Sequence, residues 1–229
     1  MKMKVWLPVL CVAGVFAAPV MASAEADRLR EAAEVVRALR SAPDNGIPEQ
    51  LWGRAECVAV IPSMKKAAFI FGGEYGRGMM SCRTANGWSA PLFMQLAKGS
   101  WGLQIGAEAV DLVLLVMNRG GVDTLLDNKV SLGVDASVAA GPVGRRGAAS
   151  TDAQLNAQIL SYSRSKGLFA GIDLSGGVLR PDKDANVEFY GRAIAARDVL
   201  SGTMTTADVA ARDFAASLGR NVTATTGRR

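Results

Sequence analysis

The chain has 229 residues, of which 49% are hydrophobic and 21% are charged, and its formal net charge is +5 at pH 7. This is the composition of a globular protein, and it excludes a disordered tail or a fibrous repeat. The chain contains no histidine, which excludes a Ser–His triad, a Cys–His pair and a His-ligated zinc site. With 25 glycines and only 6% aromatic residues, we expect a compact fold in which backbones approach one another closely.

The N-terminal residues have the pattern of a secretory signal. Lys2 and Lys4 precede an apolar run over residues 5–20, and the small residues Ala22-Ser23-Ala24 follow it. Residues 1–24 are therefore predicted to be a signal peptide that is cleaved near Ala24, which directs the mature chain to the periplasm or out of the cell. An uncleaved membrane anchor is the alternative. The run is shorter than the roughly 20 residues that a spanning helix needs, and it contains two prolines.

Removal of this segment changes both the charge and the cysteine count. The loss of two lysines lowers the net charge to about +3, which permits weak attraction to anionic surfaces. This charge is far below that of a typical nucleic-acid-binding protein, so nucleic acid is not expected as a partner. Cys57 and Cys82 are the cysteines that remain, and an oxidising compartment favours a disulfide between them. Two buried, reduced cysteines are the alternative.

The first half of the mature chain is predicted to pass from helices to strands. Apolar residues recur at helical spacing over residues 25–40, which predicts an amphipathic helix. Residues 47–52 predict a short second helix with proline in its first turn. From Cys57 the apolar period changes to two, and Asn86-Gly87 predicts a hairpin with a type I′ turn. The strands before this hairpin are expected to bend at the glycines Gly72, Gly73, Gly76 and Gly78.

The second half continues with strands and ends in a helix. Apolar and polar residues alternate most cleanly over residues 130–140, so Val134 is expected to be buried and Ser137 exposed. Asn118 is predicted to cap a short helix. Thr206 with Asp208 is predicted to open a last helix that ends at Gly219. The strands predicted in this half cover residues 102–117, 130–140, 159–163 and 168–174.

Strands joined by short hairpins favour an antiparallel sheet. The predicted fold class is α+β, with a curved, glycine-rich antiparallel sheet that forms a sandwich or a partly closed barrel and is flanked by helices at both chain ends. No break in composition divides the chain. Residues 47–220 are therefore predicted to be a single domain, preceded by the amphipathic helix and linker of residues 25–46 and followed by a polar tail over residues 221–229.

The spacing Ser-x-x-Lys occurs twice, at residues 63–66 and 163–166. In penicillin-interacting enzymes this spacing brings a lysine amine beside a serine nucleophile. Both copies fall in predicted turns rather than at a helix start, and the accompanying Ser-Asp-Asn and Lys-Thr-Gly triplets are absent from the sequence. We therefore expect no catalytic residue, no metal site and no cofactor.

Basic residues cluster in the predicted turns and are flanked there by Gly, Pro or Ser. Turns at one end of a curled sheet would bring such pairs together into a positive patch for phosphate groups. Ordinary solvated loops are the alternative, as is a structural role for Arg164 in a hydrogen-bonded pair. The basic residues concerned are Lys65, Lys66, Arg145, Arg146, Arg164 and Lys166.

Residues 161–171, with the sequence Ser-Tyr-Ser-Arg-Ser-Lys-Gly-Leu-Phe-Ala-Gly, resemble the signature segment of the SYLF lipid-binding domain family. Residues 99–111, 141–145 and 184–191 resemble further blocks of that family in the same order, and the resemblance covers about residues 47–202. It implies a domain of helices and a curved antiparallel sheet that binds phospholipid head groups. In eukaryotic members these are phosphoinositides, and some members bundle actin. The resemblance implies no catalytic residue.

For binding, the resemblance assigns Arg164 and Lys166 of the signature segment and Arg145 of the 141–145 segment, whereas the other three basic residues come from charge clustering alone. Because the chain carries a secretory signal, actin is not expected as a partner. Anionic glycerophospholipids of a bacterial envelope are expected in place of phosphoinositides. The predicted function is non-enzymatic binding of anionic phospholipid head groups or membrane surfaces in the cell envelope. A structural envelope protein that docks a protein partner is the alternative.

Overall fold

The computed structural model describes residues 23–42, 46–68, 71–101, 106–126, 129–143, 156–165 and 168–219. The apolar run of the predicted signal peptide and the predicted polar tail lie outside these residues. Three of the six predicted binding residues also lie outside them, namely Arg145, Arg146 and Lys166.

The described residues form six helices and ten strands. The helices are α1 (Ala24–Arg40), α2 (Glu49–Arg54), α3 (Arg119–Leu125), α5 (Lys183–Tyr190), α6 (Ala196–Leu200) and α7 (Val209–Ser217). The strands are β1 (Cys57–Ala68), β2 (Phe71–Thr84), β3 (Gly87–Trp88), β4 (Leu92–Trp101), β5 (Gly106–Val116), β6 (Val130–Ser131), β7 (Val138–Ala140), β8 (Ile159–Ser165), β9 (Leu168–Gly171) and β10 (Val178–Pro181). Within this described part of the chain, no helix has the length and apolar character to span a membrane.

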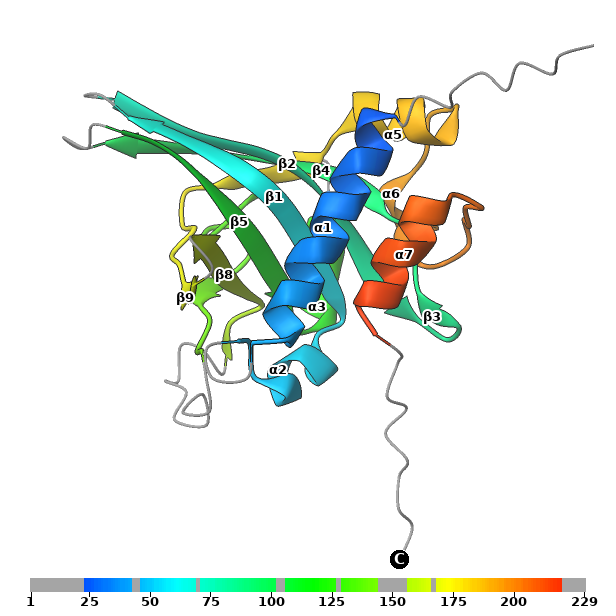
Figure 1. The fold of residues 1–229 in the computed structure, drawn as a ribbon, viewed down its shortest axis with the longest axis horizontal. Coiled ribbons are helices and arrows are strands. Elements are labelled where there is room, and N and C mark those ends of the chain that lie inside the picture. Colours follow the sequence, from blue (N-terminus) through cyan, green and yellow to red (C-terminus); the bar gives the residue numbers. More distant parts are fainter. Residues whose placement is uncertain are drawn as a thin grey trace, which may run out of the picture.

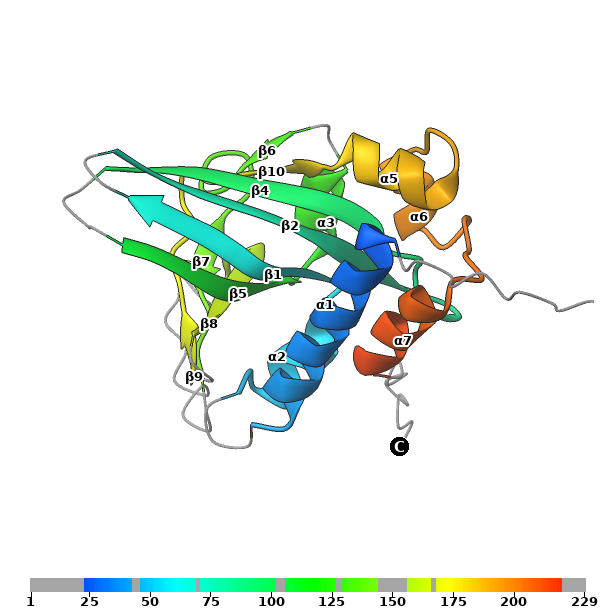
Figure 2. The same ribbon diagram turned by 45° about the horizontal axis from the view of Figure 1, so that its top comes forward.

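The strands form one curled sheet, a half-barrel that is flanked by helices (Figures 1 and 2). Its order is β6-β10-β4-β2-β1-β5-β8-β7, with β3 paired to β2 and β9 paired to β8. Neighbouring strands are antiparallel except β7 and β8, which run parallel. The predicted α+β class with a curved sheet is confirmed. The parallel pair at the edge is the departure from the predicted antiparallel arrangement.

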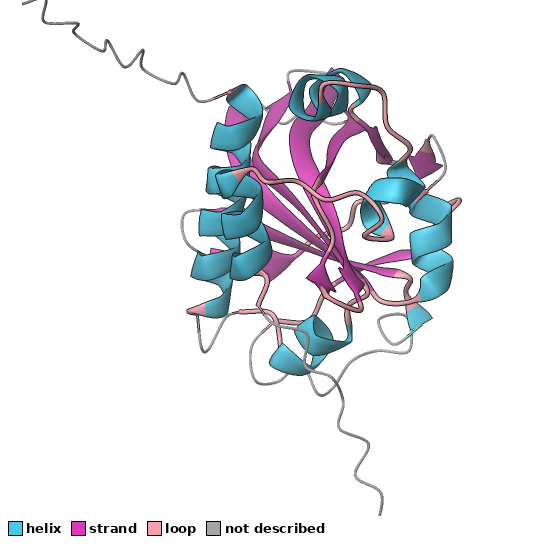
Figure 3. Cartoon of the chain, turned by 90° about the vertical axis from the view of Figure 1, so that its right-hand side faces the viewer, coloured by secondary structure: helices cyan, strands magenta, loops and turns pink. Residues whose placement is uncertain are grey.

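Alternate residues of the long strands enter two hydrophobic clusters, one on each face of the sheet. On β1, Val58 and Val60 pack toward α1 and α7, on what we call the α1 face. Ala59 and Ile61 pack on the opposite face, toward α3 and α6, which we call the α3 face. Helices therefore lie on both sides of the sheet (Figure 3). This two-sided burial explains the period of two in the sequence, because each face needs its own apolar residues.

The first long hairpin contains a bulge in β1 that faces the predicted bend glycines Gly76 and Gly78 of β2. The pairing of β1 with both neighbours shifts register around Ser63, which has a φ of 49°. These two glycines permit close approach of the strands at this bulge. A Cβ on Gly76 would lie 2.4 Å from the Cγ2 atom of Ile61, and one on Gly78 would lie 2.0 Å from the carbonyl oxygen of Val60.

The predicted hairpin at Asn86-Gly87 is confirmed as β2–β3, but its turn differs from the prediction. Thr84 pairs with Gly87, so Ala85 and Asn86 occupy the two central positions. Neither residue has a positive φ, whereas Gly87 does, at 124°. The type I′ turn predicted at Asn86-Gly87 is therefore wrong. The Thr84 hydroxyl donates to the carbonyl oxygen of Gly87 and accepts from the amide of Asn86, which supports the observed turn.

The strand predicted over residues 130–140 is wrong in its centre. Only the short strands β6 and β7 form there, and a turn separates them. Gly133 has a φ of 85°, and the Asp135 carboxylate accepts a hydrogen bond from the amide of Ser131 at 2.7 Å. Local bonds of this kind compete with strand pairing. As a result Val134 is 82% exposed rather than buried.

The predicted helix ends are confirmed where a polar side chain caps them. Asn118 accepts from the amide of Gly121 at the start of α3, and Asp208 accepts from the amide of Ala211 at the start of α7. Gly219 follows α7 with a φ of 87°. β10, α5 and α6 were not predicted from the sequence. Asp182, which accepts from the amide of Ala185 at the start of α5, was an available capping signal.

Two of the family-like segments meet in the core. Tyr162 of the signature segment is fully buried on the α1 face, and burial raises the pKa of its hydroxyl. A Cβ on Gly141 would lie 2.0 Å from the Cζ atom of Tyr162, and one on Gly171 would lie 2.4 Å from the carbonyl oxygen of Gly141. These residues are therefore needed for close packing, which accounts for the tyrosine and the glycines of these segments.

Candidate functional site

The candidate residues lie at two opposite ends of the long strands. At what we call the outer end, β1, β2, β4 and β5 extend beyond the helices (Figure 1), and β1 carries Lys65 and Lys66 there. At the inner end, β1 begins at Cys57 and β2 ends at Thr84, close to α3 and α6. At about 3.3 Å per residue, the stretch from Cys57 to Lys65 separates the two ends by roughly 26 Å.

The described members of the predicted basic patch lie toward the outer end on two strands, β1 and β8, which flank β5. Lys65 and Lys66 of β1 lie opposite Ala109 and Glu108 of β5, and Arg164 of β8 lies opposite Asp111 on the other edge of β5. The structure thus places two of the three predicted basic clusters near one end of the sheet. The members that lie outside the described residues stay predictions.

Arg164 is engaged within the fold. Its Nε and one terminal guanidinium nitrogen lie 2.7 and 2.6 Å from the Oδ2 atom of Asp111. The other oxygen of Asp111 accepts from the amide of Ser63 at 2.9 Å, in the bulge of β1. Arg164 therefore ties β8, through β5, to the bent part of β1. This is the structural alternative considered for Arg164, and it leaves less of its charge available to an external phosphate.

Of the two lysines of β1, Lys66 has an ion-pair partner within the fold and Lys65 has none among the described residues. The Lys66 amine lies 3.7 Å from a carboxylate oxygen of Glu74, its direct partner on β2. Lys65 is exposed, and within the described part of the chain no acceptor binds its amine. It borders an open hollow of about 410 Å³ between β1, β2 and the first turns of α1, where Arg28 and Arg77 accompany the acidic residues Asp27 and Glu31.

An exposed apolar residue at the outer end was missed by the sequence analysis. Leu168, the first residue of β9, lies opposite Ser165 in the hairpin of the signature segment and is 67% exposed. Its neighbour Phe169 lies opposite Arg164 and is buried on the α1 face. Because side chains alternate along a strand, Leu168 emerges on the α3 face. The alternation of this hairpin was the signal that could have identified it.

The Ser-x-x-Lys spacing does not form a serine–lysine pair in the described residues. Ser63 lies in the β1 bulge, and the Lys66 amine is directed to Glu74. Ser163 lies within β8 and not at a helix start. In this region the geometry accordingly offers no activated serine.

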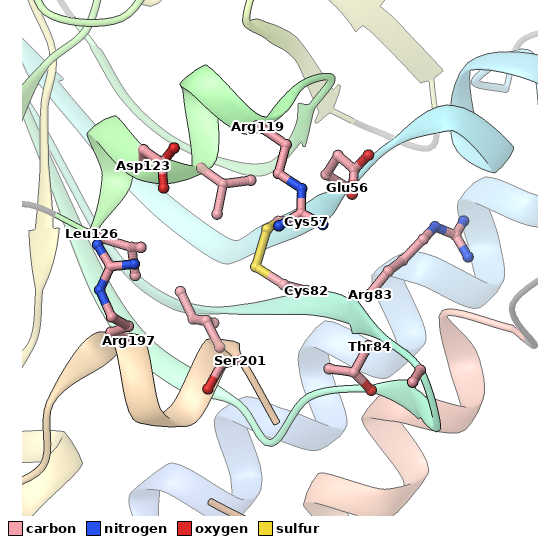
Figure 4. Close-up of a pocket in the computed structure, with 13 residues that line it drawn as sticks. Glu56, Cys57, Cys82, Arg83, Thr84, Arg119, Asp123, Leu126, Arg197 and Ser201 are labelled. Atoms are coloured by element: carbon pink, nitrogen blue, oxygen red, sulfur yellow. A yellow bond between two sulfur atoms is a disulfide. The ribbon is translucent and has the colours of Figure 1, made fainter. Parts of the chain in front are cut away.

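The predicted disulfide between Cys57 and Cys82 is present at the inner end. The two residues are direct partners across β1 and β2, with their Cα atoms 3.9 Å apart. The disulfide lines a cavity of about 380 Å³ between the strand ends, α3 and α6 (Figure 4). The other lining residues are Glu56, Arg83, Thr84, Ala85, Arg119, Val122, Asp123, Leu126, Arg197, Leu200 and Ser201.

One arginine of this cavity is directed into the protein. Arg83 donates to the carbonyl oxygens of Ala55 and Trp52, and its guanidinium carbon lies 4.5 Å from the ring centroid of Trp88. Burial lowers the pKa of the Arg83 guanidinium below its usual value, and the nearby Glu56 carboxylate opposes this effect. Figure 4 shows the guanidinium group pointing away from the disulfide. Arg83 therefore stabilises the junction of α2 with the strands.

Comparison with known proteins identifies the family. The family described as "Ysc84: Las17-binding protein actin regulator" matches residues 97–223. The chain belongs to the Ysc84 (SYLF) family. It is similar to LAS seventeen-binding protein 3 of Saccharomyces cerevisiae, with 37% identity over 163 residues that cover 69% of this chain and 35% of the relative. It is also similar to the human SH3 domain-containing YSC84-like protein 1, with 34% identity over 176 residues that cover 76% of this chain and 51% of the relative.

The chain thus spans between about a third and a half of the length of these relatives. The suggested family resemblance is confirmed. The descriptions of the family and of the yeast relative name binding, and that of the family also names regulation, rather than a catalysed reaction. They also weigh against the expectation that actin is not a partner, because the family description refers to actin regulation.

Proposed function

We propose that this member of the Ysc84 family binds anionic phospholipid head groups at a membrane surface, catalyses no reaction, and meets the membrane with the outer end of its sheet. The observation that carries this proposal is the exposed Leu168 of β9 in the signature hairpin, together with the exposed Lys65 of β1, which lies on the same sheet with β8 and β5 between the two strands. An exposed apolar side chain on the same sheet as an exposed lysine is a pattern of interfacial contact, in which leucine enters the acyl boundary and the lysine attracts phosphates.

The positions of these residues define the direction of approach. Leu168 emerges on the α3 face, whereas Lys65 lies on the α1 face beside the first turns of α1. A membrane parallel to either face would contact only one of them. The proposal is therefore that the sheet meets the membrane end-on, so that both residues contact the head-group layer.

The experiment that tests this function is vesicle co-sedimentation. The full chain is mixed with phosphatidylcholine vesicles that contain increasing phosphatidylglycerol, at low and at moderate salt. Bound protein should rise with the phosphatidylglycerol fraction and fall with salt, because a few phosphate contacts carry the attraction. Equal binding to pure phosphatidylcholine, or none at any composition, would rule out a contact of this kind.

A second candidate function comes from the family description. The names of the family and of the yeast relative refer to Las17 binding and, for the family, to actin regulation, so docking of a protein partner is the rival proposal. Co-sedimentation with actin filaments in the absence of lipid tests it directly. Docking of a protein partner would be favoured if the chain pellets with filaments and if its binding to vesicles does not depend on the phosphatidylglycerol fraction.

We further propose that the chain acts in the cell envelope after cleavage near Ala24. The charged and apolar pattern of the N-terminal residues and the disulfide at Cys57 both support this location, since disulfides persist in oxidising compartments. Expression of the whole chain in a bacterium, followed by N-terminal sequencing of the periplasmic protein, tests it. Cytoplasmic protein that retains residues 1–24 and has free thiols would refute the location.

A further inference from the structure

The inner-end cavity contains two arginines that are not engaged by the protein. Arg119 at the start of α3 and Arg197 in α6 are both exposed, and within the described residues no hydrogen bond or ion pair involves either guanidinium. Figure 4 shows the Arg119 side chain reaching from α3 toward the disulfide and the Arg197 side chain reaching from α6 toward Leu126, so the two arginines line the cavity from different helices. By contrast, Arg37, Arg77 and Arg164 each lie within ion-pair distance of an aspartate.

The cavity also has an apolar wall. The disulfide, Val122, Leu126 and Leu200 line it, and Leu200 is 4% exposed. A guanidinium beside apolar groups attracts an anion more strongly than one in open solvent, because the local dielectric constant is lower. At about 380 Å³ the cavity is also within the size range of small-molecule sites.

The charges of the lining residues limit the kind of anion. Glu56 and Asp123 balance the charges of Arg119 and Arg197, and Arg83, whose guanidinium is directed away from the disulfide, brings the formal charge of the lining to +1. Two carboxylates would repel a polyphosphate. A ligand with one phosphate group, which two guanidinium groups can hold by charge-assisted hydrogen bonds, suits this balance.

We propose that this cavity binds a single phosphate group attached to a small organic moiety of the glycerol phosphate type, either free or as the head group of a phospholipid. Arg119 and Arg197 hold the phosphate oxygens, and the wall formed by the disulfide, Val122 and Leu126 contacts the carbon atoms. The site lies roughly 26 Å from the outer end. It is therefore a second site, and it does not depend on the proposed end-on membrane contact.

Calorimetric titration of the oxidised full chain with glycerol 3-phosphate tests the site. We expect saturable binding that weakens at least tenfold in the Arg119→Gln/Arg197→Gln variant. The matched control is Arg192→Gln/Arg212→Gln, which removes two exposed arginines away from the cavity. Circular dichroism checks that both variants are folded. No saturable binding to the parent chain, or an equal loss in both variants, would overturn the proposal.

The disulfide offers a second readout that reports the location of the ligand. Because both cysteines line the cavity, saturating glycerol 3-phosphate should slow the reduction of the disulfide by dithiothreitol at least threefold. The attacking species is the dithiothreitol thiolate, which a phosphate bound beside the sulfur atoms hinders sterically and by charge repulsion. The protection should be absent in the Arg119→Gln/Arg197→Gln variant. A reduction rate that the ligand leaves unchanged in the parent chain would exclude the cavity as the site.

A comparison of probes identifies the source of the phosphate. If dihexanoyl phosphatidylglycerol binds at least tenfold more tightly than glycerol 3-phosphate, the ligand is the head group of a lipid. Equal affinities of the two support a free organic phosphate. If inorganic phosphate binds as tightly as either organic probe, the apolar wall contributes nothing to binding and this part of the proposal is wrong. The variant Lys65→Ala/Leu168→Ser should leave binding of glycerol 3-phosphate unchanged, which separates this site from the outer end.

Discussion

The outer and inner ends of the sheet carry similar numbers of basic residues but use them differently. At the outer end, Arg164 is bonded to Asp111 and Lys66 is paired with Glu74, so their charges are largely neutralised within the fold. At the inner end, Arg119 and Arg197 have no such partner among the described residues. The difference shows that the availability of a cation depends on the acids that the neighbouring strands place beside it, and not on how densely cations cluster in the sequence.

The largest effect should come from opening the disulfide at the inner end. Replacing Cys57 and Cys82 with alanine releases a loop with a sequence separation of 25 residues, and we expect the free energy of unfolding to fall by about 3–4 kcal/mol. Urea denaturation measures the change. The parent chain in strong reductant is the control and should lose a similar amount. A loss below about 1 kcal/mol in both would mean that the inner end is held by packing alone.

A smaller effect should follow from breaking the ion pair toward the outer end. The side chains of Arg164 and Asp111 are 26% and 15% exposed, so the pair lies between an exposed pair and a fully buried one. We expect Arg164→Ala to lower the free energy of unfolding by about 1–2 kcal/mol. The same substitution should cost much less when Asp111 is already alanine, since the partner is then absent.

The matched control for this ion pair is Arg192→Ala, which removes an exposed arginine that no described residue binds. It should leave the midpoint of denaturation within error of the parent value. If Arg164→Ala were equally silent, the ion pair would contribute nothing, and Arg164 would again be free to bind phosphate as the family resemblance implies.

Much of the fold could be predicted because simple periodicities dominate it. The helical spacing over residues 25–40 gave α1, and the period of two after Cys57 gave strands that bury both faces. The prediction failed over residues 130–140, where the conformation of Gly133 and the bond from Asp135 to Ser131 override the alternation. The helices α5 and α6 were missed because they have only 8 and 5 residues, too few for a clear helical period.

The candidate site was less predictable than the fold. Charge clusters revealed Lys65, Lys66 and Arg164, but no local pattern shows that β5 supplies Asp111 as a partner for Arg164. Arg119 and Arg197 stand far apart in the sequence, so a search for basic runs passes over them. Only the packing of α3 and α6 around the strand ends brings them to one cavity.

The smallest stability effect should come from Val134→Asp. Its side chain is 82% exposed in the turn between β6 and β7, so the free energy of unfolding should change by no more than about 0.5 kcal/mol. Thermal denaturation of the Val134→Asp and Arg164→Ala variants, measured side by side, checks this. If only Arg164→Ala loses stability, the loss comes from its ion pair and not from a change of net charge. If the free energy of unfolding fell by several kcal/mol, as it does when an unpaired carboxylate is buried, Val134 would be buried and the continuous strand predicted from the alternation would be right.

The most direct test of the account is a comparison of two variants in binding to vesicles that contain phosphatidylglycerol. Lys65→Ala/Leu168→Ser removes one cation and one exposed apolar side chain from the outer end. Arg212→Ala/Val209→Ser removes the same pair of properties from α7, where Val209 is 70% exposed. Since one cation contributes about 1 kcal/mol and an inserted leucine contributes at least as much, we predict at least tenfold weaker binding for the first variant and less than twofold for the second. Equal binding by two folded variants would contradict the end-on contact.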